Sequence, residues 1–157
     1  MAIALVTGTS SGIGLATAVT LARGGHTVIA TMRNLDGGDE LRQIVSAEKL
    51  PVTVTALNVD DDDSVSNAID KVLGEYGRIE VLVNNAGVIG QGSVEELPVA
   101  VFRQVMETNF FGGLRCIKAR DTGNARTSSW LHHQCDLGLR PCGSGSTRII
   151  CGLQVGF

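Results

Sequence analysis

Three spaced glycines near the N-terminus are the residues of this chain best suited to hold phosphate groups. Gly8, Gly12 and Gly14 directly follow an apolar run at residues 2–6, and a helical pattern of apolar residues starts immediately after them. A strand, a glycine turn and a helix in this order allow backbone N–H groups to approach a pyrophosphate, and the helix N-terminus adds partial positive charge. The spacing is Gly-x-x-x-Gly-x-Gly rather than the commoner Gly-x-Gly-x-x-Gly, so the motif alone is a weak signal.

Support for the motif comes from the elements around it. Apolar runs predict strands at residues 2–6, 26–31, 52–57 and 79–83, and helical spacing of apolar residues follows each of them. The first run is apolar on both faces, as in a central strand of a covered parallel sheet. Strands that alternate with helices predict right-handed crossovers, so we expect an α/β fold that is the first half of a Rossmann-type, doubly wound parallel sheet.

Two motifs together resemble the short-chain dehydrogenase/reductase family. They are Thr7-Gly8-x-x-x-Gly12-Ile13-Gly14 and Asn84-Asn85-Ala86-Gly87, and the resemblance runs almost continuously over residues 2–119. It implies an NAD(P)-binding Rossmann domain at residues 1–119, of which this chain carries the first part. The reaction implied is hydride transfer between NADP and a small carbonyl or alcohol substrate.

The resemblance also implies cofactor contacts, position by position. It assigns the pyrophosphate and the adenosine ribose to Gly8, Ser10, Gly12, Ile13 and Gly14. It assigns the adenine ring to Asn58 and Val59, and the ribose and nicotinamide side to Asn85, Ala86 and Gly87, while Asn84 is expected to brace strands. Many members of the family carry Asp where this chain has Asn58, and either side chain can accept a hydrogen bond from the adenine amino group.

The end of the second expected strand indicates which dinucleotide binds. NAD-preferring sites usually carry Asp or Glu there, and this carboxylate binds the ribose 2′-hydroxyl. This chain has Thr31-Met32-Arg33, so no carboxylate repels a 2′-phosphate and a guanidinium is available to pair with it. We therefore expect NADP rather than NAD, and the alternative interpretation of Arg33 is a solvated surface arginine.

Asn109 is the one candidate catalytic residue. It places a polar side chain on the apolar face that Phe102 and Met106 form on the helix after the fourth strand. Such a residue usually has a buried partner and no catalytic role. The string Thr108-Asn109-Phe110 is, however, similar to the family segment that carries the active-site Asn. That resemblance implies that Asn109 holds a water in the proton relay to the catalytic lysine.

The proton-transfer residues of the family are absent from the sequence. The family reaction requires Ser-x(12)-Tyr-x(3)-Lys, in which the Tyr hydroxyl exchanges the substrate proton and the Lys lowers the pKa of that hydroxyl. The only tyrosine is Tyr76 and the last lysine is Lys118, so the chain contains no Tyr-x-x-x-Lys. We expect negligible turnover. Two alternatives to an enzyme stay open, namely a non-catalytic nucleotide-binding fragment and a truncated product without function.

Residues 120–157 differ from the rest of the chain. Helical and strand periodicity is lost after residue 119, and Lys and Glu no longer occur. We expect an irregular tail that leaves the fourth strand as an open edge. We expect no metal site, because the usual zinc-ligand spacing is not found among Cys135, Cys142, Cys151, His132 and His133.

A shift of reading frame near Arg120 accounts for this change. If each later codon is read from its second base, the sequence permits a Ser codon beneath Leu137, a Tyr codon beneath Ile150 and a Lys codon beneath Gln154. These positions have the spacing Ser-x(12)-Tyr-x(3)-Lys. Synonymous codons leave freedom elsewhere, but Gln154 before Val155 allows only Lys or Arg. We therefore interpret residues 120–157 as an out-of-frame translation.

Charge and composition exclude other classes of function. The net charge is −3 and no stretch is a basic patch, which argues against nucleic acid as a partner. No apolar run approaches the roughly 18 residues of a membrane span. Residues 1–6 have no charged leader, so we expect a cytoplasmic protein. The acidic run 60–63 favours the first turn of a helix over a catalytic carboxylate cluster. Intact family members are expected to be homo-oligomers, an expectation we do not extend to this chain.

Overall fold

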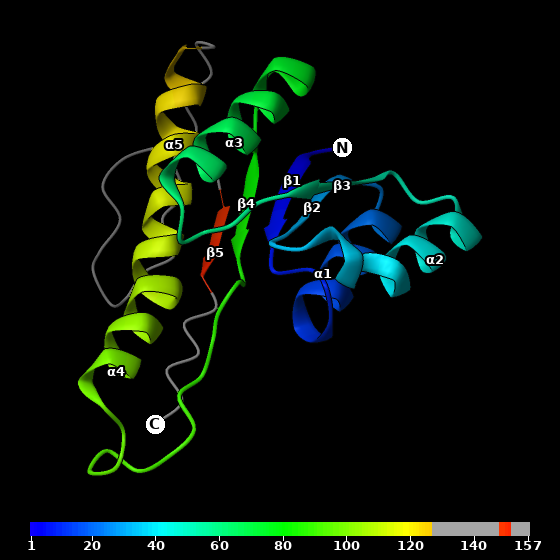
Figure 1. Cartoon of the computed structure of the whole chain (residues 1–157). Coiled ribbons are helices and arrows are strands. Elements are labelled where there is room, and N and C mark those ends of the chain that lie inside the picture. Colours follow the sequence, from blue (N-terminus) through cyan, green and yellow to red (C-terminus); the bar gives the residue numbers. More distant parts are fainter. Residues whose placement is uncertain (127–147, 152–157) are drawn as a thin grey trace.

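A five-stranded parallel sheet forms the centre of the computed structural model, which describes residues 1–126 and 148–151 (Figure 1). The strand order is β3-β2-β1-β4-β5, and every neighbouring pair is parallel. The order reverses between β1 and β4, and in such sheets ligands bind in the crevice outside the carboxyl ends of the strands at that point. The strands are β1 (Ile3–Thr7), β2 (Thr27–Met32), β3 (Val52–Ala56), β4 (Val81–Asn84) and β5 (Arg148–Cys151).

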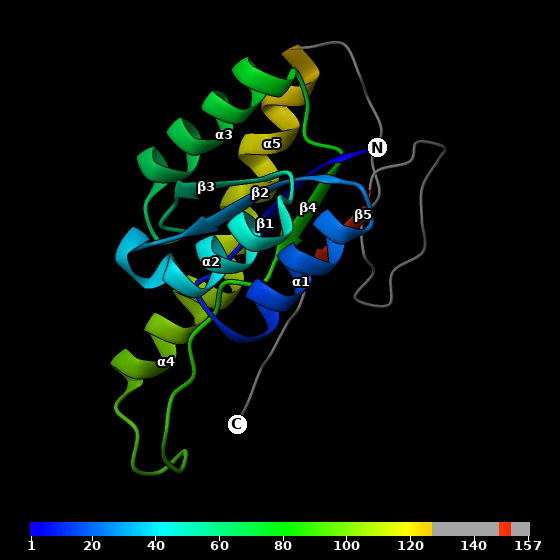
Figure 2. The ribbon, with the colours of Figure 1, turned by 90° about the vertical axis from the view of Figure 1, so that its right-hand side faces the viewer.

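Helices cover both faces of this sheet. In Figures 1 and 2, α1 and α2 lie on one face, and α3 and α5 lie on the other. The loop after β4 and the following α4 extend beyond the carboxyl ends of the strands. The α-helices are α1 (Gly12–Arg23), α2 (Asp39–Glu48), α3 (Asp62–Tyr76), α4 (Val99–Met106) and α5 (Gly113–Arg126). Two further helical segments are the 3-10 helix η1 (Leu35–Gly38) and the π-helix η2 (Glu107–Gly112).

The alternation of side chains along the strands divides the core into two clusters. Leu5 of β1 packs on one face against α3 and α5, together with Ile69 and Cys116. Its neighbour Val6 packs on the other face against α1 and α2, together with Leu41. Because both faces are covered, the central strands are apolar throughout, as the sequence predicts.

The predicted strands and helices of the Rossmann-type fold are confirmed, and the structure differs from the expected tail at two described places. Helix α5 continues to Arg126, so the expected domain boundary at residue 119 falls inside a helix. In addition, β5 pairs in parallel with β4, with Leu82 opposite Ile149, so β4 is not an open edge. The alternation of a four-residue strand is too short to show in the sequence.

The helix predicted after β4 also differs from expectation. It consists of α4, η2 and α5 in direct succession, with a π-helical turn in the middle. Met106, which lies on the face of this helix that we expected to be apolar, is 48% exposed. No helix among the described residues is long and apolar enough to cross a bilayer.

Candidate nucleotide-binding site

The glycine turn after β1 has a backbone that only glycine accommodates. Gly8 and Gly12 have φ values of +69° and +60°, in the left-handed region. Gly14 lies so close to the turn that an added Cβ would be 2.1 Å from the Gly8 carbonyl oxygen and 2.4 Å from Asn85 Nδ2. The first turn of α1 is therefore pressed directly against the end of β1 and the end of β4.

Asn85 holds the glycine turn in place. Its Nδ2 donates hydrogen bonds to the carbonyl oxygens of Thr7, at 2.9 Å, and Gly8, at 3.0 Å. Its backbone N–H donates to Thr7 Oγ1 at 3.0 Å. We expected this bracing role for the preceding residue, but Asn84 Nδ2 instead donates to the Gly113 carbonyl at 3.4 Å, on α5. The Asn85 amide thus acts on the protein backbone that shapes the turn.

The N-terminus of α1 lacks the groups that usually neutralise a helix start. Its N-cap Ser11 has an extended backbone and makes no side-chain capping hydrogen bond, and the first turn contains no acidic residue. The first backbone N–H groups of a helix have no acceptor within the helix. They and the helix dipole therefore favour an anion beside the glycine turn.

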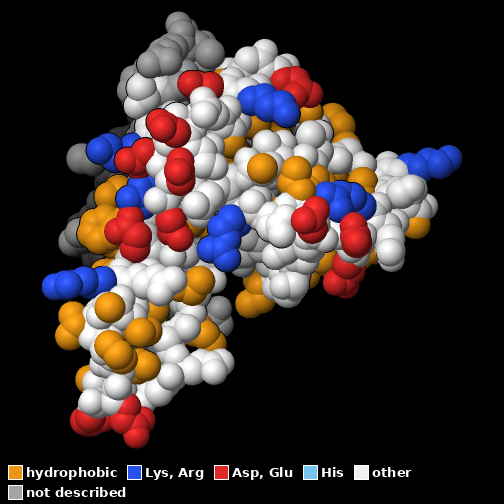
Figure 3. Space-filling model, in the orientation of Figure 1, with side chains coloured by type: hydrophobic (Ala, Val, Ile, Leu, Met, Phe, Trp, Pro, Cys, Tyr) orange, Lys and Arg blue, Asp and Glu red, His pale blue; other side chains and the backbone are white. Residues whose placement is uncertain are grey.

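A cavity of about 330 Å³ lies at this edge of the sheet. Every predicted cofactor-binding residue except Gly12 lines it: Gly8, Ser10, Ile13, Gly14, Arg33, Asn58, Val59, Asn85, Ala86 and Gly87. Figure 3 shows the same side of the molecule hollowed between α1 and the projecting loop and α4. The cavity also takes in residues that the motifs did not identify, namely Ser11, Met32, Leu57, Asp60, Val88 and Thr108. Ser11, Met32, Leu57, Asp60 and Val88 are sequence neighbours of predicted cofactor-binding residues, and Thr108 precedes the candidate catalytic Asn109. This adjacency is the one signal that could have found them.

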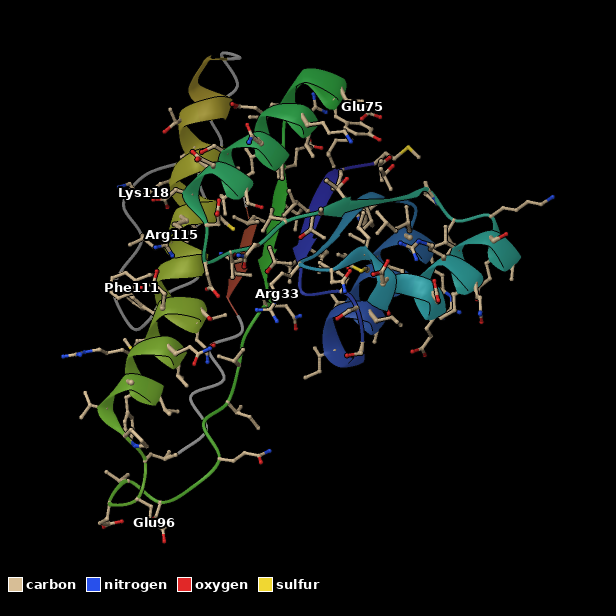
Figure 4. All side chains as sticks on the ribbon, in the orientation of Figure 1. Arg33, Glu75, Glu96, Phe111, Arg115 and Lys118 are labelled. Atoms are coloured by element: carbon tan, nitrogen blue, oxygen red, sulfur yellow. The ribbon has the colours of Figure 1, made fainter. Side chains whose placement is uncertain are left out.

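Arg33 stands at the end of β2 with its side chain exposed. Figure 4 shows this side chain at the carboxyl edge of the sheet, between α1 and the segment that leaves β4. Arg33 forms no ion pair with any residue in the described part of the chain, whereas Arg42 on α2 pairs with Asp39 at 2.9 Å. The guanidinium of Arg33 is thus available to an anionic group in the cavity.

Asn109 lies in η2, and both polar atoms of its side-chain amide form hydrogen bonds with the backbone of Val88. Its Oδ1 accepts a hydrogen bond from the Val88 backbone N–H at 2.8 Å, and its Nδ2 donates to the Val88 carbonyl at 2.9 Å. Asn109 does not line the cavity, although its Oδ1 would be 3.3 Å from a Cβ added at Gly87. The structure therefore places Asn109 as a tie between η2 and the loop after β4, and its role in a proton relay stays a prediction.

The other chemically interesting residues lie away from the cavity or outside the described residues. Tyr76 Oη is 3.3 Å from Thr53 Oγ1, at the opposite end of the sheet. Burial raises the pKa of the Cys116 thiol to about 12, so this thiol stays neutral and inert. The described residues contain no cluster of metal-binding side chains. The cysteines and histidines at residues 132–142, and the positions Leu137 and Gln154, lie outside the described residues.

Comparisons with known proteins agree with this geometry. A family model for short chain dehydrogenases matches residues 2–121. An uncharacterized oxidoreductase of Bacillus subtilis is 42% identical over 118 residues, which make up 74% of this chain and 41% of that protein. Retinol dehydrogenase 8 of Bos taurus is 43% identical over 120 residues, or 73% of this chain and 38% of that protein. The chain therefore spans about two fifths of the length of these relatives.

Solved structures show the same likeness. An alcohol dehydrogenase from the archaeon Thermococcus sibiricus, complexed with 5-hydroxy-NADP, has a TM-score of 0.72 and 33% identity. The match covers 81% of this chain and 55% of that one. Because the family model covers more than half of the chain, from the residue before β1 to within α5, this protein belongs to the short chain dehydrogenase family.

Proposed function

We propose that this chain binds NADP in the cavity at the carboxyl edge of the sheet, as the cofactor-binding part of an oxidoreductase acting on a small carbonyl or alcohol. The observation that carries the proposal is the start of α1, where Ser11 makes no side-chain cap and no acidic residue is present. This open helix end, the glycine turn and Arg33 all border one cavity. They provide backbone donors for a pyrophosphate and a cation for a 2′-phosphate.

The remaining lining residues fit the other parts of the cofactor. Asn58 and Val59, at the end of β3, would take the adenine ring, and Ala86 and Gly87 the nicotinamide side. NADP, when bound, supplies the hydride chemistry, and these residues supply position alone. The alcohol dehydrogenase of Thermococcus sibiricus, a structural neighbour, was crystallised with a modified NADP, which supports the choice of cofactor.

Selectivity between the two dinucleotides tests this proposal. NADPH and NADH are titrated by fluorescence into the wild type, Arg33→Ala and the control Arg103→Ala, whose side chain is exposed on α4 away from the cavity. Loss of one charge-assisted contact predicts about tenfold weaker NADPH binding by Arg33→Ala, because such contacts are worth about 1.5–3 kcal/mol and 1.4 kcal/mol is tenfold. NADH binding should not change. Equal effects on both dinucleotides would contradict the role of Arg33.

We further propose that the 157-residue chain binds the cofactor without turning over substrate. Its single tyrosine, Tyr76, contacts Thr53 at the far end of the sheet, and Lys does not follow it at the required spacing. General acid–base groups contribute about 10²–10⁴-fold to such reactions. NADPH oxidation with a panel of aldehydes and ketones should therefore stay at background. Measurable reduction contradicts this proposal, and absence of dinucleotide binding favours a fragment without function.

The burial of Arg120 supports the interpretation that the reading frame shifts near this residue, so that the family sequence ends there. Its side chain is 1% exposed, and its Nε and Nη1 have no hydrogen-bond partner among the described residues. Burial lowers the pKa of its guanidinium, although Asp121 partly opposes this. Five positions earlier, Arg115 pairs with Asp62 and Glu107 and is 25% exposed. The family match ends one residue after Arg120.

Two measurements test this boundary. The coding DNA should show Tyr and Lys codons beneath Ile150 and Gln154 in the shifted frame, and other codons there would end the interpretation. Arg120→Met should raise the free energy of unfolding by about 1–4 kcal/mol. It replaces a buried guanidinium, paired with Asp121 through Nη2 at 3.3 Å but with Nε and Nη1 unpartnered among the described residues, by an apolar side chain. The control Arg115→Met should lower the free energy of unfolding, since Arg115 has partners.

A further inference from the structure

The π-helix η2 contacts both sides of the cavity through two consecutive side chains. Asn109 binds the backbone of Val88, in the loop after β4. Thr108 Oγ1 donates a hydrogen bond to Asp60 Oδ2 at 3.1 Å, in the loop between β3 and α3. π-helical turns are rare and are frequent at functional sites. Here the turn allows neighbouring residues to reach two loops that lie far apart in the sequence.

Thr108 is placed as a structural contact rather than as a surface hydroxyl. It is 6% exposed, and it lines the cavity together with Asn58, Val59 and Asp60. Asp60 Oδ1 is buried without a hydrogen-bond partner in the described part of the chain, so the Thr108 hydroxyl is the side-chain donor that this carboxylate has there. A buried carboxylate that loses its donor moves toward water.

The rest of the β3–α3 loop is held mainly by its own residues. Asn58 accepts from the backbone N–H of Asp61 at 3.2 Å through its carbonyl, and Ser64 Oγ binds the Asn58 N–H at 2.9 Å. From outside, Arg115 donates to the Val59 carbonyl at 3.4 Å, which is a long contact, and its ion pairs join Asp62, at the start of α3, to Glu107 of η2. At Asp60 itself, the side-chain contact from η2 is the Thr108 hydroxyl.

Close packing at one more point shows how tightly η2 and this loop fit. A Cβ added at Gly112, one turn after Thr108, would lie 2.8 Å from Val59 Cγ2. Contacts of that length do not occur between real atoms without displacement, so η2 and Val59 are already in contact. Val59 therefore gives the loop a second contact with η2, next to the Thr108–Asp60 hydrogen bond.

We propose that Thr108 is a positioning residue for the adenine-binding loop, residues 58–60. Its hydrogen bond to Asp60 holds the Asp60 end of this loop against η2, so that the adenine end of the cavity is formed before the cofactor arrives. This inference rests on the proposed function, because adenine is assigned to this loop there. Thr108 acts through Asp60, and it therefore affects NADP and NAD equally, whereas Arg33 distinguishes between them.

Three variants test the proposal in the full chain. Thr108→Val removes the hydroxyl with little change of shape, Thr108→Ser retains it, and the control Thr122→Val removes a hydroxyl that binds the Lys118 carbonyl on the exposed side of α5. Hydrogen exchange of the ligand-free protein should become faster in peptides spanning residues 57–61 of Thr108→Val, and stay unchanged in peptides spanning β1 and α1. Thr108→Ser and Thr122→Val should behave as the wild type.

Dinucleotide titration gives the second readout. Thr108→Val should weaken NADPH and NADH binding by the same factor, about tenfold, which corresponds to one buried charged acceptor losing its donor. Thr108→Ser should restore both affinities. If Thr108→Val does not fold, Asp60→Ala breaks the same bond without leaving a buried carboxylate, and it should give the same two effects.

The outcomes separate the two proposals. Unchanged exchange at residues 57–61, or faster exchange throughout the chain, overturns the positioning role of Thr108. If the wild type binds both dinucleotides and Thr108→Val binds them with the same affinities, the positioning role is overturned as well. If the wild type binds neither dinucleotide, the proposed function fails, and faster exchange confined to residues 57–61 still supports the bond as a positioning contact.

Discussion

Helices α1 and α3 both start at the carboxyl edge of the sheet, but their first turns have opposite chemistry. At α3, the Asp61 side chain accepts a hydrogen bond from the Ser64 backbone N–H at 2.7 Å, and Asp62 and Asp63 follow in the first turn. At α1, Ser11 provides no side-chain cap and no acidic residue follows. Acidic side chains also gather over α3 and α5 in Figure 3.

This difference leaves one helix end of the fold open to an anion. A carboxylate cap satisfies orphan N–H groups and compensates the positive end of the helix dipole, so α3 has little affinity left for an anion. At α1 the same groups stay open beside a cavity. The helix gives up part of its own stabilisation, and a bound phosphate can supply it.

The largest effect is expected where the α1 turn is most crowded. Gly14→Ala puts a Cβ within 2.1 Å of the Gly8 carbonyl oxygen, so we expect lost NADPH binding and a decrease of several kcal/mol in the free energy of unfolding. The matched control is Gly74→Ala in α3, where an added Cβ meets nothing within 4 Å. It should stabilise the protein by about 0.5–1 kcal/mol. Thermal unfolding and NADPH titration measure both variants. Similar stability and similar NADPH affinity of Gly14→Ala and Gly74→Ala would contradict the special role of the α1 turn.

A smaller effect is expected when α1 is given the charge of α3. Ile13 is 66% exposed, so Ile13→Asp introduces a carboxylate into the first turn without disturbing the core. NADPH binding should weaken about tenfold at low salt and less at high salt, because screening reduces the repulsion. The helix itself should gain about 0.3–1 kcal/mol from the dipole. Ile13→Asn serves as the uncharged control, and an equal loss of affinity in both variants would rule out the electrostatic explanation.

The smallest effect concerns the start of α3. Asp61→Ala removes the cap and should lower the free energy of unfolding by about 1 kcal/mol, within the range of about 0.5–2 kcal/mol for such caps. NADPH affinity should not change, because we assign the phosphates to the start of α1. Asp61→Asn, which also caps well, should retain the stability. Chemical denaturation measures the loss, and weaker NADPH binding by Asp61→Ala would show that the two helix starts are not separate.

The sequence was sufficient to predict the first four strands of the sheet, the glycine turn and most of the residues that line the cavity. Central strands are apolar on both faces, and Gly8 and Gly14 stand where the backbone allows no other residue. These features follow from local constraints, which appear directly in residue type and spacing. The sequence could not show which of Asn84 and Asn85 braces the glycine turn. The two residues are identical neighbours, and only the direction in which each side chain projects distinguishes them.

The features that sequence reasoning missed depend on tertiary contacts. The π-helical turn at Glu107–Gly112 has no distinct pattern of residues, and its last residue, Gly112, packs closely against Val59, far away in the sequence. The short β5 becomes a strand through pairing with β4. The Thr108–Asp60 bond joins residues 48 positions apart, and no spacing rule links them.

One measurement tests the central claim directly. In a ¹⁵N-labelled sample, NADPH is added while the backbone amide resonances of Gly12, Ile13 and Gly14 in α1 are compared with those of Asp63 and Ser64 in α3. We predict saturable chemical-shift changes that are large in α1 and small in α3. Shifts that are absent from α1, or equal in the two helices, would contradict the assignment of the phosphates to the open end of α1.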